Sequence, residues 1–216
     1  IALSLVGSEM CIRDSGNILP ANQLGSIAIK LPLAPGALPS LWKADDRFVS
    51  AYLSKFPGYY ETGDAGLKDE DGYMYIMART DDVINVAGHR LSTGAMEEIL
   101  ADHKDVAECA VVGISDELKG QVPLGLVCLT DGVNRRESEV KEELVQMVRG
   151  RLGPVAFFKQ ALIIKRLPKT RSGKILRSTV CKIADGEKFK MPATIDDPLI
   201  LDEIKEALAT LGYPKN

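Results

Sequence analysis

The chain has 216 residues, of which 45% are hydrophobic and 26% charged, and its formal net charge at pH 7 is −3. These values are ordinary for a globular protein of one or two domains, so they exclude a disordered or collagen-like chain. The slightly acidic balance gives no support to wholesale nucleic-acid binding, which favours a basic domain. No apolar run approaches the roughly 18 residues of a membrane span.

The cysteines are widely scattered, with no CxxC pair and only two histidines to assist them. This spacing disfavours a zinc site and a disulfide framework. We therefore expect free thiols in a reducing compartment at Cys11, Cys109, Cys128 and Cys181.

The chain opens without Met, and residues 1–15 show no period that continues into residues 16–58. Their apolar start lacks the basic region of a signal peptide. We expect residues 1–15 to be a foreign or unstructured leader, and the chain to be part of a longer protein.

Residues 16–58 are rich in Pro and Gly and contain one short predicted strand at 26–31, which is typical of an irregular domain edge. We expect residues 16–80 to be the C-terminal edge of a large β-rich domain. A helix is predicted over 45–54. We expect an aromatic cluster, rather than a substrate pocket, around this helix, formed by Trp42, Phe48, Tyr52 and Phe56.

A hairpin is predicted next, with strands at 65–68 and 73–78 around the turn pair Asp71-Gly72. The acidic residues 69–71 could be mistaken for a calcium loop. They lack the ligand spacing and the distal Glu of an EF-hand, so a solvated turn is the better interpretation.

From residue 81 helices and strands are mixed. This order indicates a small α+β domain over 81–190, with a helical C-terminal extension over 191–216 that opens at Asp197-Pro198. Helices are predicted near 92–103, 140–152 and 175–183, and strands at 107–113, 122–130 and 161–165.

Three segments could carry chemistry. In the YETGD segment, Asp64 follows a Gly at a strand end, where a carboxylate could accept two ribose hydroxyls. For this motif taken alone, a plain Asx turn is the better explanation. In the segment 79–90, Gly88 permits close approach of a ligand, and Arg79 and Arg90 could bind phosphate or ribose oxygens. The alternative for this segment is a surface hairpin with solvated charges.

The third segment, 167–177, belongs to a basic run from 165 to 190 with nine Lys or Arg residues and two acids. Gly173-Lys174 is similar to the end of a phosphate-binding P-loop, but the first Gly of that motif is missing and Ile175 replaces the magnesium-binding Ser or Thr. A P-loop is therefore rejected. A mobile basic loop that presents Lys174 to an anion remains, beside the alternatives of a solvated basic face or an RNA or membrane patch.

In this order and spacing, YETGD, RTDDVINVAGHR and LPKTRSGKILR resemble the late core motifs of the adenylate-forming, AMP-binding enzymes. The resemblance covers residues 16–216 and is strongest to short-chain acyl-CoA synthetases of the acetate– and propionate–CoA ligase type. The TIDDP segment at 194–198 is more similar to propionate–CoA ligase. The implied fold is the small α+β C-terminal domain of this superfamily, preceded by a β-rich edge of its large N-terminal domain.

The resemblance implies a two-step ligase. ATP and a carboxylic acid give an acyl-adenylate and pyrophosphate, and the CoA thiol then gives the thioester and AMP. For the first step it implies that Asp64 binds the ribose hydroxyls, that Arg79 and Arg90 contact the nucleotide and its phosphates, and that Lys174 is the adenylation lysine. Asp81 would be the hinge between the two steps.

For the second step the resemblance implies that Gly88, with Ala87 and His89, lines the CoA tunnel and that Arg149 meets the CoA nucleotide phosphates. The family often has Ser where this chain has Ala87. His103, with the backbone of Ala101 and Val106, matches a magnesium site of relatives, while a favourable position near a helix C-terminus explains His103 equally well.

The phosphate loop and acyl pocket that this family places nearer its N-terminus are absent from these residues, so we expect the chain alone to be inactive. At the level of the family, we expect the acid to be acetate or propionate and the compartment to be the mitochondrial matrix or the cytoplasm. We also expect the missing N-terminal domain as a partner, and neither nucleic acid nor a membrane. Two alternatives remain: a luciferase-like or peptide-synthetase branch of the superfamily, and a free-standing anion-binding module that uses the basic run.

Overall fold

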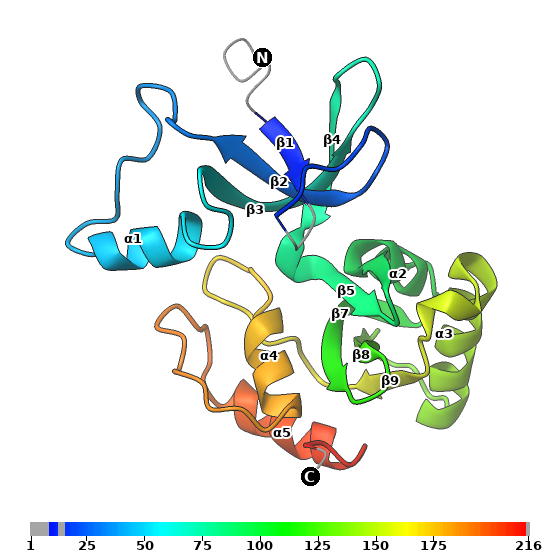
Figure 1. Cartoon of the computed structure of the whole chain (residues 1–216). Helices are drawn as coiled ribbons and strands as arrows, with labels where there is room; N and C mark the ends of the chain where they lie inside the picture. Colours follow the sequence, from blue (N-terminus) through cyan, green and yellow to red (C-terminus); the bar gives the residue numbers. More distant parts are fainter. Residues whose placement is uncertain (1–8, 13–15, 215–216) are drawn as a thin grey trace. The chain divides into compact units, whose positions relative to one another are not determined.

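The computed structural model describes residues 9–12 and 16–214 of the chain (Figure 1). The chain divides into two compact units, Ile1–Asp81 and Asp82–Asn216. The boundary between them falls in the short 3-10 helix η1, Thr80–Asp82. None of the described helices combines the length and apolarity needed to cross a membrane.

The first unit is built on an antiparallel sheet in the order β1-β2-β3-β4. Its small core contains Ile12, Ala28 and Phe56. The predicted strand and the predicted hairpin are both confirmed. The strands are β1 Glu9–Ile12, β2 Gly25–Lys30, β3 Tyr59–Lys68 and β4 Met74–Arg79.

Part of the expected leader is ordered in this sheet. Strand β1 pairs antiparallel with β2, and Cys11 and Ile12 are buried. Backbone pairing and burial together hold these residues, so the expectation of an unstructured leader is wrong for Glu9–Ile12. The remaining residues of that leader, 1–8 and 13–15, lie outside the described ones.

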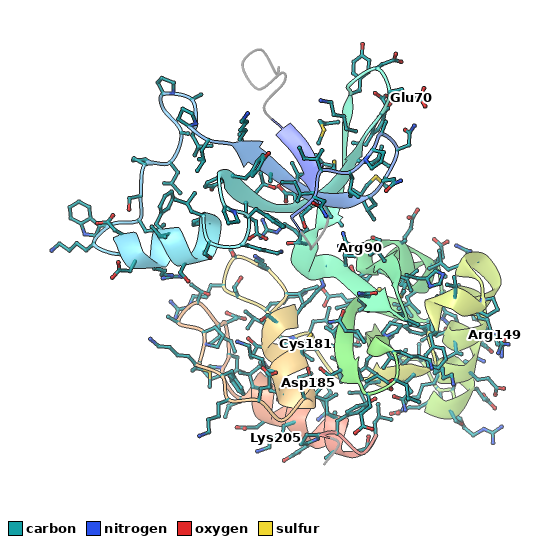
Figure 2. All side chains as sticks on the ribbon, in the orientation of Figure 1. Glu70, Arg90, Arg149, Cys181, Asp185 and Lys205 are labelled. Carbon is teal, nitrogen blue, oxygen red and sulfur yellow. The ribbon has the colours of Figure 1, made fainter. Side chains whose placement is uncertain are left out.

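The hairpin turn is longer than the predicted two-residue turn. The N–H of Gly72 donates to the carbonyl oxygen of Asp69 (3.2 Å), and the side chain of Asp69 accepts the N–H of Tyr73 (2.8 Å). Gly72 takes the left-handed conformation (φ 90°) that returns the chain to β4. The turn therefore centres on Glu70 and Asp71, and Glu70 lies at its tip in Figure 2.

Helix α1, Asp45–Tyr52, is two residues shorter than predicted. Phe48 packs near Tyr52 and Tyr60, and Tyr52 stacks on Tyr60 with ring centroids 5.3 Å apart. The expectation for Trp42 is wrong, because its side chain is 89% exposed and Tyr60 of β3 takes the place expected for it. Phe56 is buried in the sheet core instead.

The second unit has one sheet in the order β6-β5-β8-β7, with β9 added parallel to β8. The three predicted strands are confirmed with longer or shifted bounds, and β7 and β8 form a hairpin. The strands are β5 Val83–Val86, β6 His89–Ser92, β7 Val106–Asp116, β8 Gly120–Leu129 and β9 Gln160–Ile163.

Helices cover both faces of this sheet because successive strand residues point to opposite sides. On β7, Val111 joins a core with helices α2 and α3, whereas Ala110 and Val112 join a core with α4 and α5. The mixed α+β fold is confirmed. The helices are α2 Thr93–Ala101, α3 Glu137–Leu152, α4 Arg177–Ala184 and α5 Ile200–Ala209, with a 3-10 turn η2 at Pro154–Ala156.

Local signals place the helix ends. The N–H of Ala95 donates to the Ser92 hydroxyl at the start of α2 (3.3 Å), and Gly153 ends α3 with a positive φ of 81°. Helix α5 begins later than predicted. Asp197 accepts the N–H of Leu199 (3.0 Å) in a preceding turn, and the helix starts at Ile200.

Candidate functional site

Asp64 and Arg79 lie opposite one another on β3 and β4. Arg79 Nη1 is 3.7 Å from Asp64 Oδ1, and both side chains are partly exposed. The Thr62 hydroxyl accepts the N–H of Asp64 (3.1 Å) and donates to the carbonyl oxygen of Ile27 (2.9 Å). Asp64 is therefore a strand residue, and the Asx-turn alternative is wrong.

The backbone conformation and close surroundings of Gly63 explain why a glycine precedes Asp64. Its φ is +78°, and a Cβ there would lie 2.9 Å from Arg79 Nη2. A side chain at this position would therefore displace the guanidinium from Asp64. The pair presents an acceptor for hydroxyl groups beside a donor for phosphate oxygens.

The segment 83–92 forms the hairpin of β5 and β6, with Ala87 and Gly88 as its two-residue turn. Both have positive φ, 49° and 86°, which is the conformation of the tight turns that suit twisted strands. The N–H of Ala87 donates to the carbonyl oxygen of Lys119 (2.8 Å). Gly88 and His89 are exposed, and a Cβ on Gly88 would meet nothing within 4 Å.

Arg90 stands opposite Asn85 in this hairpin, so four predicted site residues, 87–90, lie on one small element. Arg149 lies on a different element, in the last turn of α3, with an exposed side chain (Figure 2). Residues 83–92 therefore form a surface hairpin, as the alternative interpretation expected. A surface hairpin can still contact a ligand.

Lys174 lies on a tight loop before α4. The N–H of Thr170 donates to the Lys174 carbonyl oxygen (2.8 Å), and the N–H of Lys174 donates to the Thr170 hydroxyl (3.1 Å). The loop is also tied to the segment before α5, because the N–H of Arg171 donates to the carbonyl oxygen of Thr194 (2.9 Å). These bonds give the loop a defined conformation, and its expected mobility stays a prediction.

The Lys174 side chain is exposed and has no ion pair among the described residues. Two other cations of the basic run are paired with acids from outside it: Lys169 contacts Glu108, and Arg166 contacts Asp197 and Glu203. Lys174 is one of several cations of the run without an ion pair among the described residues, and its place on the hydrogen-bonded loop distinguishes it from them.

One network was missed by the sequence interpretation. Arg177, the first residue of α4, donates to both carboxylate oxygens of Glu97 on α2 (2.9 and 3.0 Å), and its Nη1 is 3.6 Å from Asp82. Glu97 also accepts the N–H of the buried Val111 (2.7 Å). Within the second unit, this network links the residue after Asp81 to the helix that begins just beyond the Lys174 loop.

His103 is buried, and both of its ring nitrogens are engaged. Nδ1 accepts the N–H of Asp105 (3.2 Å), so the ring proton sits on Nε2, which faces Glu143 at 2.9 Å. Among the described residues no group of three His, Cys, Asp or Glu side chains could hold a metal. Both ring nitrogens are therefore occupied within the chain. The magnesium site expected at His103 with the backbone of Ala101 and Val106 stays a prediction.

Arg135 joins this group by hydrogen bonds to Glu143 and Asp105. The bonds from Arg135, and next that from His103, lower the pKa of the Glu143 carboxyl from 4.5 to about 2. Because the folded pKa is the lower one, the Glu143 carboxylate stabilises the fold above about pH 4.5, and this contribution disappears as the pH falls toward 2.

We expect Glu143→Gln to reduce the loss of stability between pH 4.5 and 2, because the variant has no carboxylate to protonate. The measurement is the free energy of unfolding in urea at several pH values. Glu142→Gln is the matched control, since Glu142 is an exposed neighbour with no ion pair among the described residues. Identical acid profiles for the wild type and Glu143→Gln would contradict this coupling.

The cysteines are free, as predicted. Burial raises the pKa of three thiols to about 11, so they are protonated at neutral pH and poor nucleophiles. These are Cys109, Cys128 and Cys181.

Comparison with known proteins identifies a matching family. Residues 95–174 match the model of the AMP-binding enzyme C-terminal domain. This segment carries the similarity to AMP-binding enzymes. The matched segment runs from α2 to Lys174, so it includes His103, Arg149 and the loop that ends at Lys174.

Relatives extend this similarity over most of the chain. An uncharacterized protein of Pseudomonas aeruginosa is 58% identical over 195 residues, which cover 90% of this chain and 31% of that protein. The mitochondrial acyl-CoA synthetase short-chain family member 3 of Mus musculus is 53% identical over 199 residues, 92% of this chain and 29% of that protein. The chain thus spans less than a third of the length of these relatives.

A solved structure agrees with the fold of this AMP-binding enzyme domain. The amide bond synthetase of Marinactinospora thermotolerans is 28% identical and superposes with a TM-score of 0.61, covering 81% of this chain and 34% of that one. The similarity therefore extends beyond the segment matched by the family model.

Proposed function

We propose that the complete protein carrying this chain is an ATP-dependent short-chain acyl-CoA synthetase. The observation that carries the proposal is the preorganised loop of an AMP-binding enzyme C-terminal domain that presents Lys174, whose ammonium has no ion pair among the described residues. The similarity to a short-chain acyl-CoA synthetase across 92% of the chain supports the CoA-ligase branch over other adenylate-forming enzymes.

The proposed first step joins the carboxylate to the α-phosphate of ATP. Asp64 accepts the ribose hydroxyls, and Arg79 and Arg90 bind the nucleotide. Negative charge collects between the carboxylate, the α-phosphate and the leaving pyrophosphate, and the Lys174 ammonium stabilises it there. The loop is already fixed by backbone hydrogen bonds, so little reorganisation is needed when that charge develops.

In the proposed second step the small domain turns about Asp81, and the Ala87-Gly88-His89 turn admits the pantetheine of CoA. Arg149 contacts the nucleotide phosphates of CoA. The thiol attacks the acyl carbonyl, and AMP leaves. Magnesium would travel with the ATP, and we propose no step through a protein-held ion.

The proposed acid is propionate, because residues 194–198 resemble propionate–CoA ligase. The proposed compartment is the mitochondrial matrix or the cytoplasm. The test is acyl-CoA formation by the complete protein with acetate, propionate and butyrate. We expect ATP-dependent thioester formation fastest with propionate, and none from the 216-residue chain alone. Adenylate formation without transfer to CoA would overturn the CoA-ligase assignment, and faster turnover of acetate would overturn the propionate assignment.

A further inference from the structure

An ion pair, rather than a helix cap, fixes the end of the Lys174 loop. Helix α4 begins at Arg177, three residues after Lys174, and its N-cap residue, Leu176, makes no side-chain hydrogen bond to the helix. A cation in the first turn of a helix is unfavourable, because it lies at the positive end of the helix dipole. The Glu97 carboxylate neutralises this cation and anchors it, since its two oxygens accept Arg177 Nη2 at 2.9 and 3.0 Å.

The Glu97 side chain is itself held in place. It is only 18% exposed, and the Arg177 side chain is 22% exposed, so water screens this ion pair less than it screens one on the open surface. Glu97 Oε1 also accepts the N–H of Val111 (2.7 Å), which is fully buried on β7. One carboxylate on α2 therefore connects the core strand β7 to the start of α4.

The anchored helix start is joined directly to the loop that carries Lys174. The N–H of Leu176 donates to the carbonyl oxygen of Pro168 (2.9 Å), so the residue before Arg177 closes the base of the loop. Within the loop, the N–H of Thr170 donates to the carbonyl oxygen of Lys174 (2.8 Å). A shift of Arg177 would therefore move the base of the loop and, with it, the Lys174 ammonium.

We propose that Glu97 is a positioning residue for adenylate formation and that it acts through Arg177 on Lys174. The proposal rests on the proposed function, in which the Lys174 ammonium stabilises the charge of the first step. Such a group accelerates a reaction only near its productive position, and a misplacement of about 1 Å can cost on the order of a hundredfold in rate. Because Glu97 acts on a position and binds no substrate in this proposal, its loss lowers kcat and leaves the KM for ATP unchanged.

The first test uses Glu97→Gln in the complete protein. The amide keeps an oxygen for the Val111 N–H but removes the charge that holds Arg177. Pyrophosphate exchange should fall by about ten- to a hundredfold, with an unchanged KM for ATP and unchanged thioester formation from supplied acyl-adenylate. Glu98→Gln is the matched control, since Glu98 is an exposed neighbour on α2 with no ion pair among the described residues. Equal losses in both half-reactions would indicate a merely structural role and overturn the proposal.

A double variant tests whether the effect passes through the lysine. If it does, adding Glu97→Gln to Lys174→Ala should lower pyrophosphate exchange no further than Lys174→Ala alone. Losses that multiply would contradict this route. Arg177→Lys keeps the charge but not the planar fork, so it should show the same selective loss of the first half-reaction at a smaller size.

The last test needs no activity and uses the 216-residue chain. In Glu97→Gln, the amide hydrogens of Thr170 and Lys174 should exchange with solvent about tenfold faster than in the wild type, whereas Glu98→Gln should match the wild type. Unchanged exchange at both amides would overturn the positioning role. Absence of pyrophosphate exchange by the wild-type complete protein would instead reject the proposed function, and hydrogen exchange would still decide whether Glu97 positions the loop.

Discussion

Lys174→Ala in the complete protein should slow adenylate formation by about 10²–10³-fold, the usual cost of removing one preorganised charge-stabilising donor. Thioester formation from supplied acyl-adenylate should stay close to wild type. The reason is geometric: the Lys174 ammonium is exposed, has no ion pair among the described residues and sits on a loop fixed by Thr170. Pyrophosphate exchange measures the first half-reaction, and thioester release from synthetic acyl-adenylate measures the second.

Lys188→Ala is the matched control for this experiment. Lys188 lies in the same basic run, is exposed and also has no ion pair among the described residues. It should leave both half-reactions unchanged. Acetylation of Lys174 removes the same charge and should reproduce the alanine variant. An equal loss of both half-reactions in Lys174→Ala would refute the assignment of this lysine to adenylation.

Gly88→Leu should give the opposite pattern, with thioester formation reduced about a hundredfold, as misplaced reactants can cause, and adenylate formation retained. A Cβ at this position meets nothing within 4 Å inside the chain, so the added side chain would project from the hairpin turn into the path proposed for pantetheine. The measurements are the same two half-reactions, made on the complete protein.

Backbone strain is the competing explanation, because Gly88 has a φ of +86°. Gly132→Leu controls for it: Gly132 has a φ of +82° and equally open surroundings, and it lies in the loop before α3. If both variants lose thioester formation to the same extent, a general strain effect accounts for the loss and the tunnel assignment fails.

Local sequence signals predicted most of the second unit. Periodic apolar residues and recognisable ends located α2 and α3, and the Gly153-Pro154 pair stopped α3 where predicted. The three motifs together predicted the similarity to AMP-binding enzymes that the comparisons find. These features depend on residues close in sequence, which periodicity and turn chemistry describe well.

Contacts between distant residues were not predictable in this way. Glu97 and Arg177 are 80 residues apart, and His103 and Glu143 are 40 apart. Nothing in the pattern around either partner identifies the other. The prediction for Trp42 was wrong for a related reason: Tyr60, from a later strand, stacks on Tyr52 in the aromatic cluster, and Trp42 is exposed.

The Arg177–Glu97–Asp82 network has a mechanical consequence for the proposed hinge. Asp82 comes directly after the proposed hinge residue, and Arg177 stands three positions after Lys174. The ionic contacts therefore connect the start of the second unit to the loop of the proposed adenylation lysine. A change of backbone angles at Asp81 would then rotate the second unit, including Lys174, as a rigid body. Without the Glu97 carboxylate, the same rotation would position the Lys174 ammonium less precisely.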